Sequence, residues 1–102
     1  MSEMIKITNE EQFREEIKSG KVLIDFNATW CGPCRMLMPL VHDLASKTND
    51  VKFLDVDVDI NPEIAREYQV MSIPMLAILE NGKLINKHVG FASPEQLKNL
   101  IK

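Results

Sequence analysis

The chain has 102 residues, of which 45% are hydrophobic and 26% charged, and its formal net charge is −3. This length suits one domain with one core, and the mild acidity argues against a nucleic-acid-binding surface, which normally needs a basic stripe. No apolar run approaches the ~20 residues of a membrane span, and the first residues lack the features of a signal peptide. We therefore expect residues 1–102 to form a single domain in the cytoplasm, with neither nucleic acid nor membrane as a partner.

The first predicted elements are a short strand that contains Ile5 and Ile7 and a helix that ends at Gly20. Thr8 and Glu11 have the spacing of a capping box, in which each side chain accepts a hydrogen bond from the other residue's backbone N–H. We therefore expect Thr8 to cap this helix.

The next run, residues 22–26, is apolar except for one acid, Asp25. A nearly continuous apolar run is typical of a strand that is buried on both faces of a parallel or mixed sheet. After Trp30 and a pair of cysteines, apolar residues recur three and four apart, which predicts a helix. We expect Pro39 to kink this helix, because proline has no backbone N–H to donate.

The second half of the chain begins with a predicted strand over residues 51–58. Asn61 and Pro62 then indicate the start of a helix that ends near Tyr68, since proline suits the first helical position.

Residues 75–79 and 84–89 are apolar runs on either side of an Asn-Gly pair, which is a strong hairpin signal. Ser93 and Gln96 form a second expected capping box, at the start of a last helix. The element order β-α-β-α-β-α-β-β-α predicts an α/β fold, with a mixed sheet covered by helices on both faces.

The only two cysteines are Cys31 and Cys34, separated by Gly32 and Pro33. A disulfide that closes so short a loop removes little entropy from the unfolded chain, so the pair indicates redox chemistry or metal binding rather than stabilisation. Cys31 is expected at a helix start, where the backbone dipoles stabilise a thiolate, so it is the predicted nucleophile. Cys34 lies one turn further along the helix and is the predicted resolving cysteine, which releases the reduced substrate.

A structural zinc site usually takes four ligands, and the chain offers only these two cysteines and two histidines. His42 lies about two helical turns beyond Cys34, too far away to complete the same site. We therefore expect no metal in a monomer. A metal shared across a dimer, or a partner-binding module without turnover, stays an alternative that elemental analysis and exchange assays would decide.

Asp25 is a lone acid in an apolar strand. Desolvation should raise its pKa, and a neighbouring thiolate should raise it further. We predict that Asp25 exchanges a proton with Cys34. The alternative is a structural acid that is hydrogen-bonded to backbone.

Pro74 follows Ile73 and precedes a predicted strand, which is a position where proline fits a sheet. If the bond between them were cis, the backbone of Ile73 would form an open edge, to which a substrate could add as a strand. By sequence physics alone, cis is the minority outcome.

Taken together, these features resemble the thioredoxin family over nearly the whole chain. The residues that carry the resemblance are Asp25, Phe26, Ala28, Trp30, Cys31, Gly32, Pro33, Cys34, Pro39, Asp57, Asn61, Pro62, Tyr68, Ile73, Pro74, Asn81, Gly82 and Gly90.

The resemblance implies the thioredoxin fold, a central five-stranded mixed β-sheet flanked by four α-helices, with a cis bond before Pro74. It implies a protein-disulfide reductase in which Cys31 attacks, Cys34 resolves and Asp25 assists, through a reversible Cys31–Cys34 disulfide. It also implies no bound cofactor, a monomer, and recycling by a thioredoxin reductase that draws on NADPH or ferredoxin. Disulfide-containing protein substrates would bind to a flat apolar patch of Trp30, Gly32, Pro33, Ile73, Pro74, Val89, Gly90 and Phe91.

Five departures from the family pattern lie near these positions. Arg35 replaces a common lysine and keeps its charge, and Ser72 replaces a common glycine; the other three are Asn27, Asp55 and Met75. Asn27 stands where many members have tryptophan, which puts the packing of the active-site loop in question. Asp55 stands where many have lysine and some glutamate, so it should raise the pKa of Asp25 further if the two are close. Met75 replaces the usual threonine after the proline, where it would alter substrate contacts or redox potential.

Overall fold

The computed structural model describes residues 3–102, and within them the predicted order of strands and helices is confirmed. The elements are β1 (Met4–Lys6), α1 (Glu10–Glu16), β2 (Lys21–Asn27), α2 (Gly32–Ser46), β3 (Val51–Asp57), α3 (Pro62–Glu67), β4 (Met75–Glu80), β5 (Lys83–Val89) and α4 (Pro94–Leu100).

The strands form one mixed sheet in the order β1-β3-β2-β4-β5. β1, β3 and β2 run parallel to one another, whereas β4 runs antiparallel to both β2 and β5. β2 lies at the centre of the sheet, beneath helices on both faces, which explains why its sequence is apolar almost without interruption.

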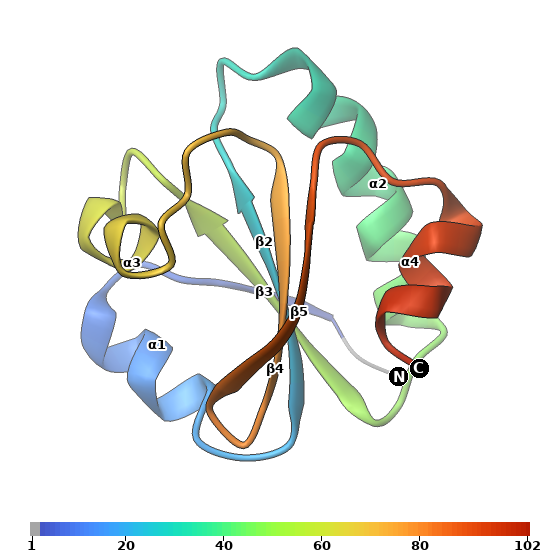
Figure 1. Ribbon diagram of the computed structural model, residues 1–102, viewed down its shortest axis with the longest axis horizontal. Coiled ribbons are helices and arrows are strands. Elements are labelled where there is room, and N and C mark those ends of the chain that lie inside the picture. Colours follow the sequence, from blue (N-terminus) through green and yellow to red (C-terminus); the bar gives the residue numbers. More distant parts are fainter. Residues whose placement is uncertain (1–2) are drawn as a thin grey trace.

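The helices form a layer on each face of the sheet, α1 and α3 on one side and α2 and α4 on the other (Figure 1). Val22, Ile24 and Phe26 of β2 point toward α1 and α3, whereas Leu23 packs with the residues of α2 and α4. Because successive side chains of a strand alternate between faces, Asp25 and Asn27 share the face of Leu23. The buried acid therefore lies beneath α2, the helix that follows the cysteine motif.

The start of α1 differs from the prediction by one residue. Asn9, not Thr8, is the N-cap, and its Oδ1 accepts a hydrogen bond from the Gln12 backbone N–H at 2.7 Å. The Gln12 side chain reaches back to the Thr8 N–H, also at 2.7 Å. The prediction was wrong because Asn9 can cap a helix as well as Thr8, and Gln12 can reach back from the first turn to the Thr8 N–H in place of Glu11.

The predicted end of α1 at Gly20 is also wrong, because α1 ends at Glu16, and Gly20, with a φ of 80°, lies in the turn before β2. The cap of α4 and the turn between β4 and β5 are confirmed. Ser93 and Gln96 form a complete capping box at the start of α4. Asn81 and Gly82 both have positive φ, 51° and 84°, as a tight hairpin turn between β4 and β5 requires. Pro39 lies inside α2, which continues to Ser46, and its kink stays a prediction.

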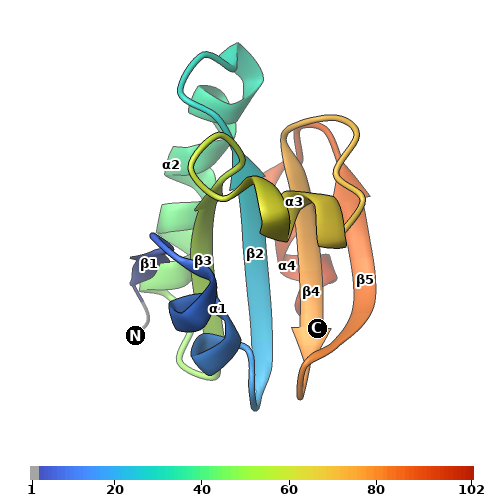
Figure 2. The ribbon, with the colours of Figure 1, turned by 90° about the vertical axis from the view of Figure 1, so that its left-hand side faces the viewer.

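Three connections meet at one end of the sheet. The segments after β2, before β4 and after β5 lie together there in both views (Figures 1 and 2). The carboxyl ends of strands in an α/β sheet are where binding sites usually form. Within residues 3–102, no helix has both the length and the apolar character needed to cross a bilayer.

Candidate active site

Cys31 and Cys34 lie at this end of the sheet and are joined by a disulfide, with 5.2 Å between their Cα atoms. Cys31 is the N-cap of α2, and its Sγ accepts a hydrogen bond from the Cys34 N–H at 3.2 Å. The helix start therefore points a backbone donor and the positive end of its dipole at this sulfur, which favours a thiolate once the disulfide is reduced.

The two cysteines are almost equally buried in the disulfide form, at 5% exposure for Cys31 and 3% for Cys34. The difference in exposure between the two residues is therefore slight. What distinguishes the two sulfurs is position, since Cys31 caps the helix and Cys34 lies within its first turn.

The cysteines have an apolar surround. Together with Ala28 they form a small buried cluster, against which Val58 and Ile73 pack. Ile73, which the sequence placed in the substrate edge, therefore touches the cysteine cluster itself. Low polarity around the sulfurs strengthens any interaction with a charge that forms there.

Trp30 is 66% exposed beside this cluster. Its indole Nε1–H donates a hydrogen bond to Oδ2 of Asp59 at 2.8 Å. The ring is therefore held in one orientation while its surface stays available. Asp59 was not predicted as a partner of Trp30, because no pattern links an exposed acid to a tryptophan that is distant in the chain.

The Ile73–Pro74 bond is cis, as the resemblance implied. The Pro74 carbonyl accepts a hydrogen bond from the Gly90 N–H at 2.7 Å, which ties the start of β4 to the end of β5. Gly90 has a φ of 96°, a conformation that favours glycine. Ile73 lies outside β4, and no backbone hydrogen bond to another described residue is recorded for it.

The residues of the predicted substrate patch differ in accessibility. Five are exposed at the surface: Trp30, Gly32, Pro33, Val89 and Phe91. Ile73 and Gly90 are half-buried, and Pro74 is buried. The sequence missed Met71, an exposed residue that lines a hollow with Trp30 and Ile73, because an isolated methionine in a turn carries no pattern.

Met75 corrects one expectation. Its side chain is 2% exposed and packs in the hydrophobic cluster beneath α1 and α3. Met75 therefore does not contact a substrate directly, because the alternation along β4 turns its side chain to the face opposite Leu76.

Asp25 is 1% exposed, and neither of its carboxyl oxygens has a hydrogen-bond partner among the described residues. The alternative of a structural acid bonded to backbone is therefore wrong. Burial and, after it, the negative charge of Asp55 together raise the pKa of Asp25 to about 7, while the Asn27 side chain acts in the opposite direction. The effect of Asp55 is the one expected if the two acids are close. An acid that titrates near neutral pH suits proton exchange with a thiol.

Asn27 is buried, and its packing is settled by two hydrogen bonds. Its Nδ2 donates to the Asp25 backbone carbonyl at 3.0 Å and to Oδ1 of Asp55 at 2.8 Å. Beside it lies a cavity of about 140 Å³, lined by Asn27, Ala28, Thr29, Cys34, Arg35 and Met38.

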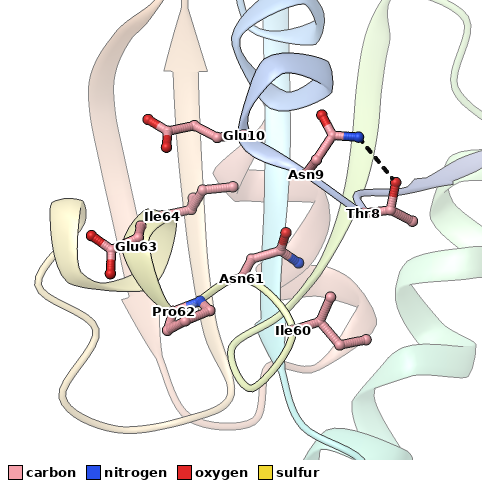
Figure 3. Close-up of a pocket in the computed structure, with 8 residues that line it drawn as sticks. All are labelled: Thr8, Asn9, Glu10, Ile60, Asn61, Pro62, Glu63 and Ile64. Carbon is pink, nitrogen blue, oxygen red and sulfur yellow. Dashed lines mark hydrogen bonds between the residues drawn. The ribbon is translucent and has the colours of Figure 1, made fainter.

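A second cavity, of about 120 Å³, lies where α1 and α3 begin, and no cysteine lines it (Figure 3). Its lining residues are Thr8, Asn9, Glu10, Ile60, Asn61, Pro62, Glu63 and Ile64. The Asn61 amide is committed to the carbonyls of Ile7 and Asp57, so it serves the fold. Among residues 3–102, no group of three or more His, Cys, Asp or Glu side chains is arranged to hold a metal ion.

Comparison with known proteins matches this architecture to one family. Residues 4–102 match the model of the thioredoxin family. The chain is 43% identical to the thioredoxin of Chlamydia trachomatis over 98 residues, which cover 96% of each protein. It is 41% identical to the thioredoxin of Staphylococcus epidermidis over 99 residues, 96% of this chain and 94% of that one.

Solved structures give the same result. The mitochondrial thioredoxin 3 of Saccharomyces cerevisiae, in its oxidised form, superposes with a TM-score of 0.87 at 42% identity, covering 96% of this chain and 92% of that chain. A mutant thioredoxin from Halobacterium salinarum superposes with a TM-score of 0.90 at 35% identity, covering 97% of this chain and 88% of that chain.

Proposed function

The chain belongs to the thioredoxin family, and from this premise we propose which of its residues carry each step of the reaction. It is a thiol–disulfide oxidoreductase with protein-disulfide reductase activity, and it acts through a redox-active disulfide between Cys31 and Cys34. The observation that supports the division of roles best is the position of Cys31 as the N-cap of α2, with its sulfur facing the Cys34 N–H.

Cys31 makes the first attack. As a thiolate, its sulfur displaces one sulfur of the substrate disulfide and forms a mixed disulfide, while the other substrate sulfur leaves as a thiolate. The helix start lowers the free energy of the Cys31 thiolate relative to the thiol, so more of the reactive form is present at neutral pH.

Cys34 completes the reaction. Its thiol gives a proton to the Asp25 carboxylate, and the resulting thiolate attacks Cys31 to form the intramolecular disulfide. The second substrate sulfur leaves with the electron pair and takes up a proton. Two electrons and two protons pass in total from the dithiol to the substrate. Asp25 supports this role because it is buried on the face of β2 beneath α2, where Cys34 lies in the first turn.

The substrate face consists of Trp30, Gly32, Pro33, Ile73, Pro74, Val89, Gly90 and Phe91, and the substrates are disulfide-containing proteins. The contact of Ile73 with the cysteine cluster and the absence of recorded backbone hydrogen bonds at Ile73 among the described residues support it. A substrate segment would add alongside Ile73 by backbone pairing, and Trp30 would contact its side chains.

A thioredoxin reductase would return the disulfide to the dithiol, in the cytoplasm. The pairing of the two cysteines across only two residues supports a compartment where thiols are kept reduced.

The test is reduction of insulin at pH 7, driven by dithiothreitol or by NADPH with a thioredoxin reductase. We expect the wild-type chain to accelerate the reaction, and Cys31→Ser to lose the acceleration entirely. Cys34→Ser should retain the first attack and accumulate a covalent mixed disulfide, visible on a non-reducing gel.

The two cysteine variants serve as controls for each other, because both remove one thiol from the same turn. An undiminished rate with Cys31→Ser, or a trapped adduct through Cys34 instead, would refute the proposed roles. Stoichiometric zinc in the purified protein would favour the metal-binding alternative.

A further inference from the structure

Met71 leaves an unusual amount of apolar surface in contact with solvent. Its side chain is 94% exposed, more than any of the other exposed large apolar side chains among residues 3–102. It lies in the connection between α3 and β4, one of the three connections that meet at the cysteine end of the sheet (Figure 1). The Met71 side chain is therefore free to contact another molecule close to the site of the reaction.

Met71 lines an apolar hollow of about 170 Å³. The lining residues are Trp30, Val58, Val70, Met71, Ser72 and Ile73. Only Ser72 among them offers a free polar side chain, because the indole N–H of Trp30 is engaged by Asp59. Trp30 and Ile73 also belong to the proposed substrate face. The hollow therefore extends that face, and its chemistry suits an apolar side chain of the protein substrate.

A second hollow, of about 590 Å³, is also lined by Met71. Three of its other lining residues, Arg66, Gln69 and Lys87, carry N–H donors. Arg66 is paired with Glu63 at 2.6 Å, whereas no partner of the Lys87 ammonium is recorded within the part of the chain that the structure describes. Met71 thus lies at the boundary between an apolar hollow and one that offers hydrogen-bond donors.

An exposed thioether reacts with hydroperoxides. The sulfur attacks one oxygen of the peroxide, so that an S–O bond forms while the O–O bond breaks. The proton of the transferred hydroxyl passes to the leaving oxygen, which departs as water when the oxidant is hydrogen peroxide. The sulfur loses two electrons and the peroxide gains them. The product is methionine sulfoxide, which is polar where the thioether was apolar.

We propose that Met71 is an oxidation site, at which a hydroperoxide reversibly lowers the affinity of this chain for its protein substrates. The inference rests on the proposed substrate face and adds to it a contact residue that oxidation removes. The flexible Met71 thioether adapts to an apolar substrate side chain in the smaller hollow. The sulfoxide carries a polar group into that contact, while the donors of the larger hollow favour its oxygen. Methionine sulfoxide reductases restore the thioether.

The cysteine chemistry should survive this modification. Val58 and Ile73 pack against the cluster of Ala28, Cys31 and Cys34, but Met71 does not belong to that group. In the disulfide form neither cysteine has a free thiol, so peroxide can be applied to it without oxidising a thiolate. Oxidation should therefore change the KM for a protein substrate while kcat stays the same.

The experiment treats the disulfide form of the wild-type chain with hydrogen peroxide, removes the peroxide, and measures insulin reduction driven by dithiothreitol, a reductant that needs no docking surface. Mass spectrometry of peptides gives the extent of oxidation at each methionine. Met71 should oxidise ahead of Met38 and Met75, which are half-buried and buried. The KM for insulin should rise about tenfold, a size typical of a polar group that enters an apolar contact. The reduction of hydroxyethyl disulfide should not change.

Met36 provides the matched control, because it is 67% exposed on α2 and lines neither hollow. Met36→Leu should lose affinity after peroxide treatment as the wild type does. Met71→Leu should keep the KM that it had before treatment, because leucine has no sulfur to oxidise. Incubation of the oxidised wild type with both stereospecific methionine sulfoxide reductases and dithiothreitol should restore its original KM. Circular dichroism checks that each treated chain is folded.

The inference would be overturned by an unchanged KM after complete oxidation of Met71, by an equal rise in treated Met71→Leu, or by a Met71 that resists peroxide while Met36 is oxidised. Trp30→Ala separates the two levels of the argument. If Trp30→Ala raises the KM of the untreated chain but oxidation of Met71 does not, only the role of Met71 fails. If both changes leave the KM as it was, the proposed substrate face fails as well.

Discussion

At the scale of single residues, Asp25 is costly to the fold. Its carboxyl is fully buried without a hydrogen-bond partner among the described residues, and its pKa is raised from 3.8 to about 7, first by burial and then by Asp55. A group whose pKa is raised by folding binds its proton more tightly in the folded chain than in the unfolded chain. The contribution of Asp25 to the free energy of unfolding is therefore greatest below pH 4, and it falls as the pH rises from about 4 to 7.

Asp25→Asn should remove this pH dependence. The variant should be more stable than wild type by up to about 4 kcal/mol above pH 8, and nearly equal to it at about pH 3, where Asp25 is mostly protonated in both the folded and the unfolded wild type. Urea unfolding at a series of pH values measures the difference. Asp50→Asn, at an exposed site, should leave the wild-type slope unchanged. A variant no more stable than wild type at pH 8 would contradict the buried, uncompensated acid.

Much of the candidate site was open to prediction because its chemistry is local in sequence. The spacing of Cys31 and Cys34 at a helix start indicates the nucleophile and its resolving partner, and an acid within an apolar strand indicates a perturbed carboxyl. The hydrogen bond between the side chains of Asn27 and Asp55 was not predictable in this way. It depends on the register between β2 and β3, which no local pattern in either strand specifies.

At the scale of elements, the start of α1 shows which of two neighbouring cap residues is used. Both Thr8 and Asn9 can cap a helix, and both have a residue three positions later that can reach back. The structure selects Asn9, whose Oδ1 faces the Gln12 N–H, while the Gln12 amide also donates to the Lys6 carbonyl at 3.0 Å. The extra bond to β1 favours this start over the other, and it exists only in the folded arrangement of β1 and α1.

Replacing the cap residue tests this assignment. Asn9→Ala should lower the free energy of unfolding by about 1 kcal/mol, the usual cost of losing an N-cap side chain. Thr8→Ala is the matched control and should cost less, because the Thr8 hydroxyl makes only long hydrogen bonds, to Gln12 Oε1 at 3.3 Å and from Asn9 Nδ2 at 3.4 Å. Urea denaturation of both variants gives the comparison. A larger loss for Thr8→Ala would restore the cap expected from sequence.

The boundaries of the strands followed from apolar runs and turn residues, and they differ from the prediction by only one or two positions. The run at 22–26 corresponds to Lys21–Asn27, and 51–58 corresponds to Val51–Asp57. Polar residues at strand ends explain the difference, because Asn27 continues β2 by pairing with Asp57 although its side chain gives no sign of a strand.

At the scale of the whole molecule, two hydrophobic clusters lie on opposite faces of one sheet. Ile64 of α3 belongs to one cluster and Leu97 of α4 to the other, and both are almost completely buried. Because β2 and β4 contribute side chains to both clusters, loss of packing on either face should weaken the same sheet. The expectation of a single domain for residues 1–102 therefore predicts that both clusters unfold together, in one cooperative transition.

Ile64→Ala and Leu97→Ala should each lower the free energy of unfolding by roughly 2–5 kcal/mol, the range for a large aliphatic residue removed from a core. Each variant should still unfold in one transition. Circular dichroism reports the whole sheet and helices, and the fluorescence of Trp30, the only tryptophan, reports the active-site end. Coincident transitions are expected; two separated transitions in either variant would mean that the two faces fold as separate units.

The strand order also leaves the sheet with two unequal edges. β1 offers only three residues, whereas β5 presents seven, all but one of them well exposed. An exposed edge strand has unpaired backbone N–H and C=O groups, through which copies of a protein can associate. An antiparallel alignment of two copies centred on Ile85 would set Lys83 of each copy opposite Lys87 of the other, and like charges directly opposite each other oppose pairing. The two lysines of β5 thus oppose self-association along the longer edge, and the backbone that we propose for substrate pairing lies beside the cysteines, at Ile73.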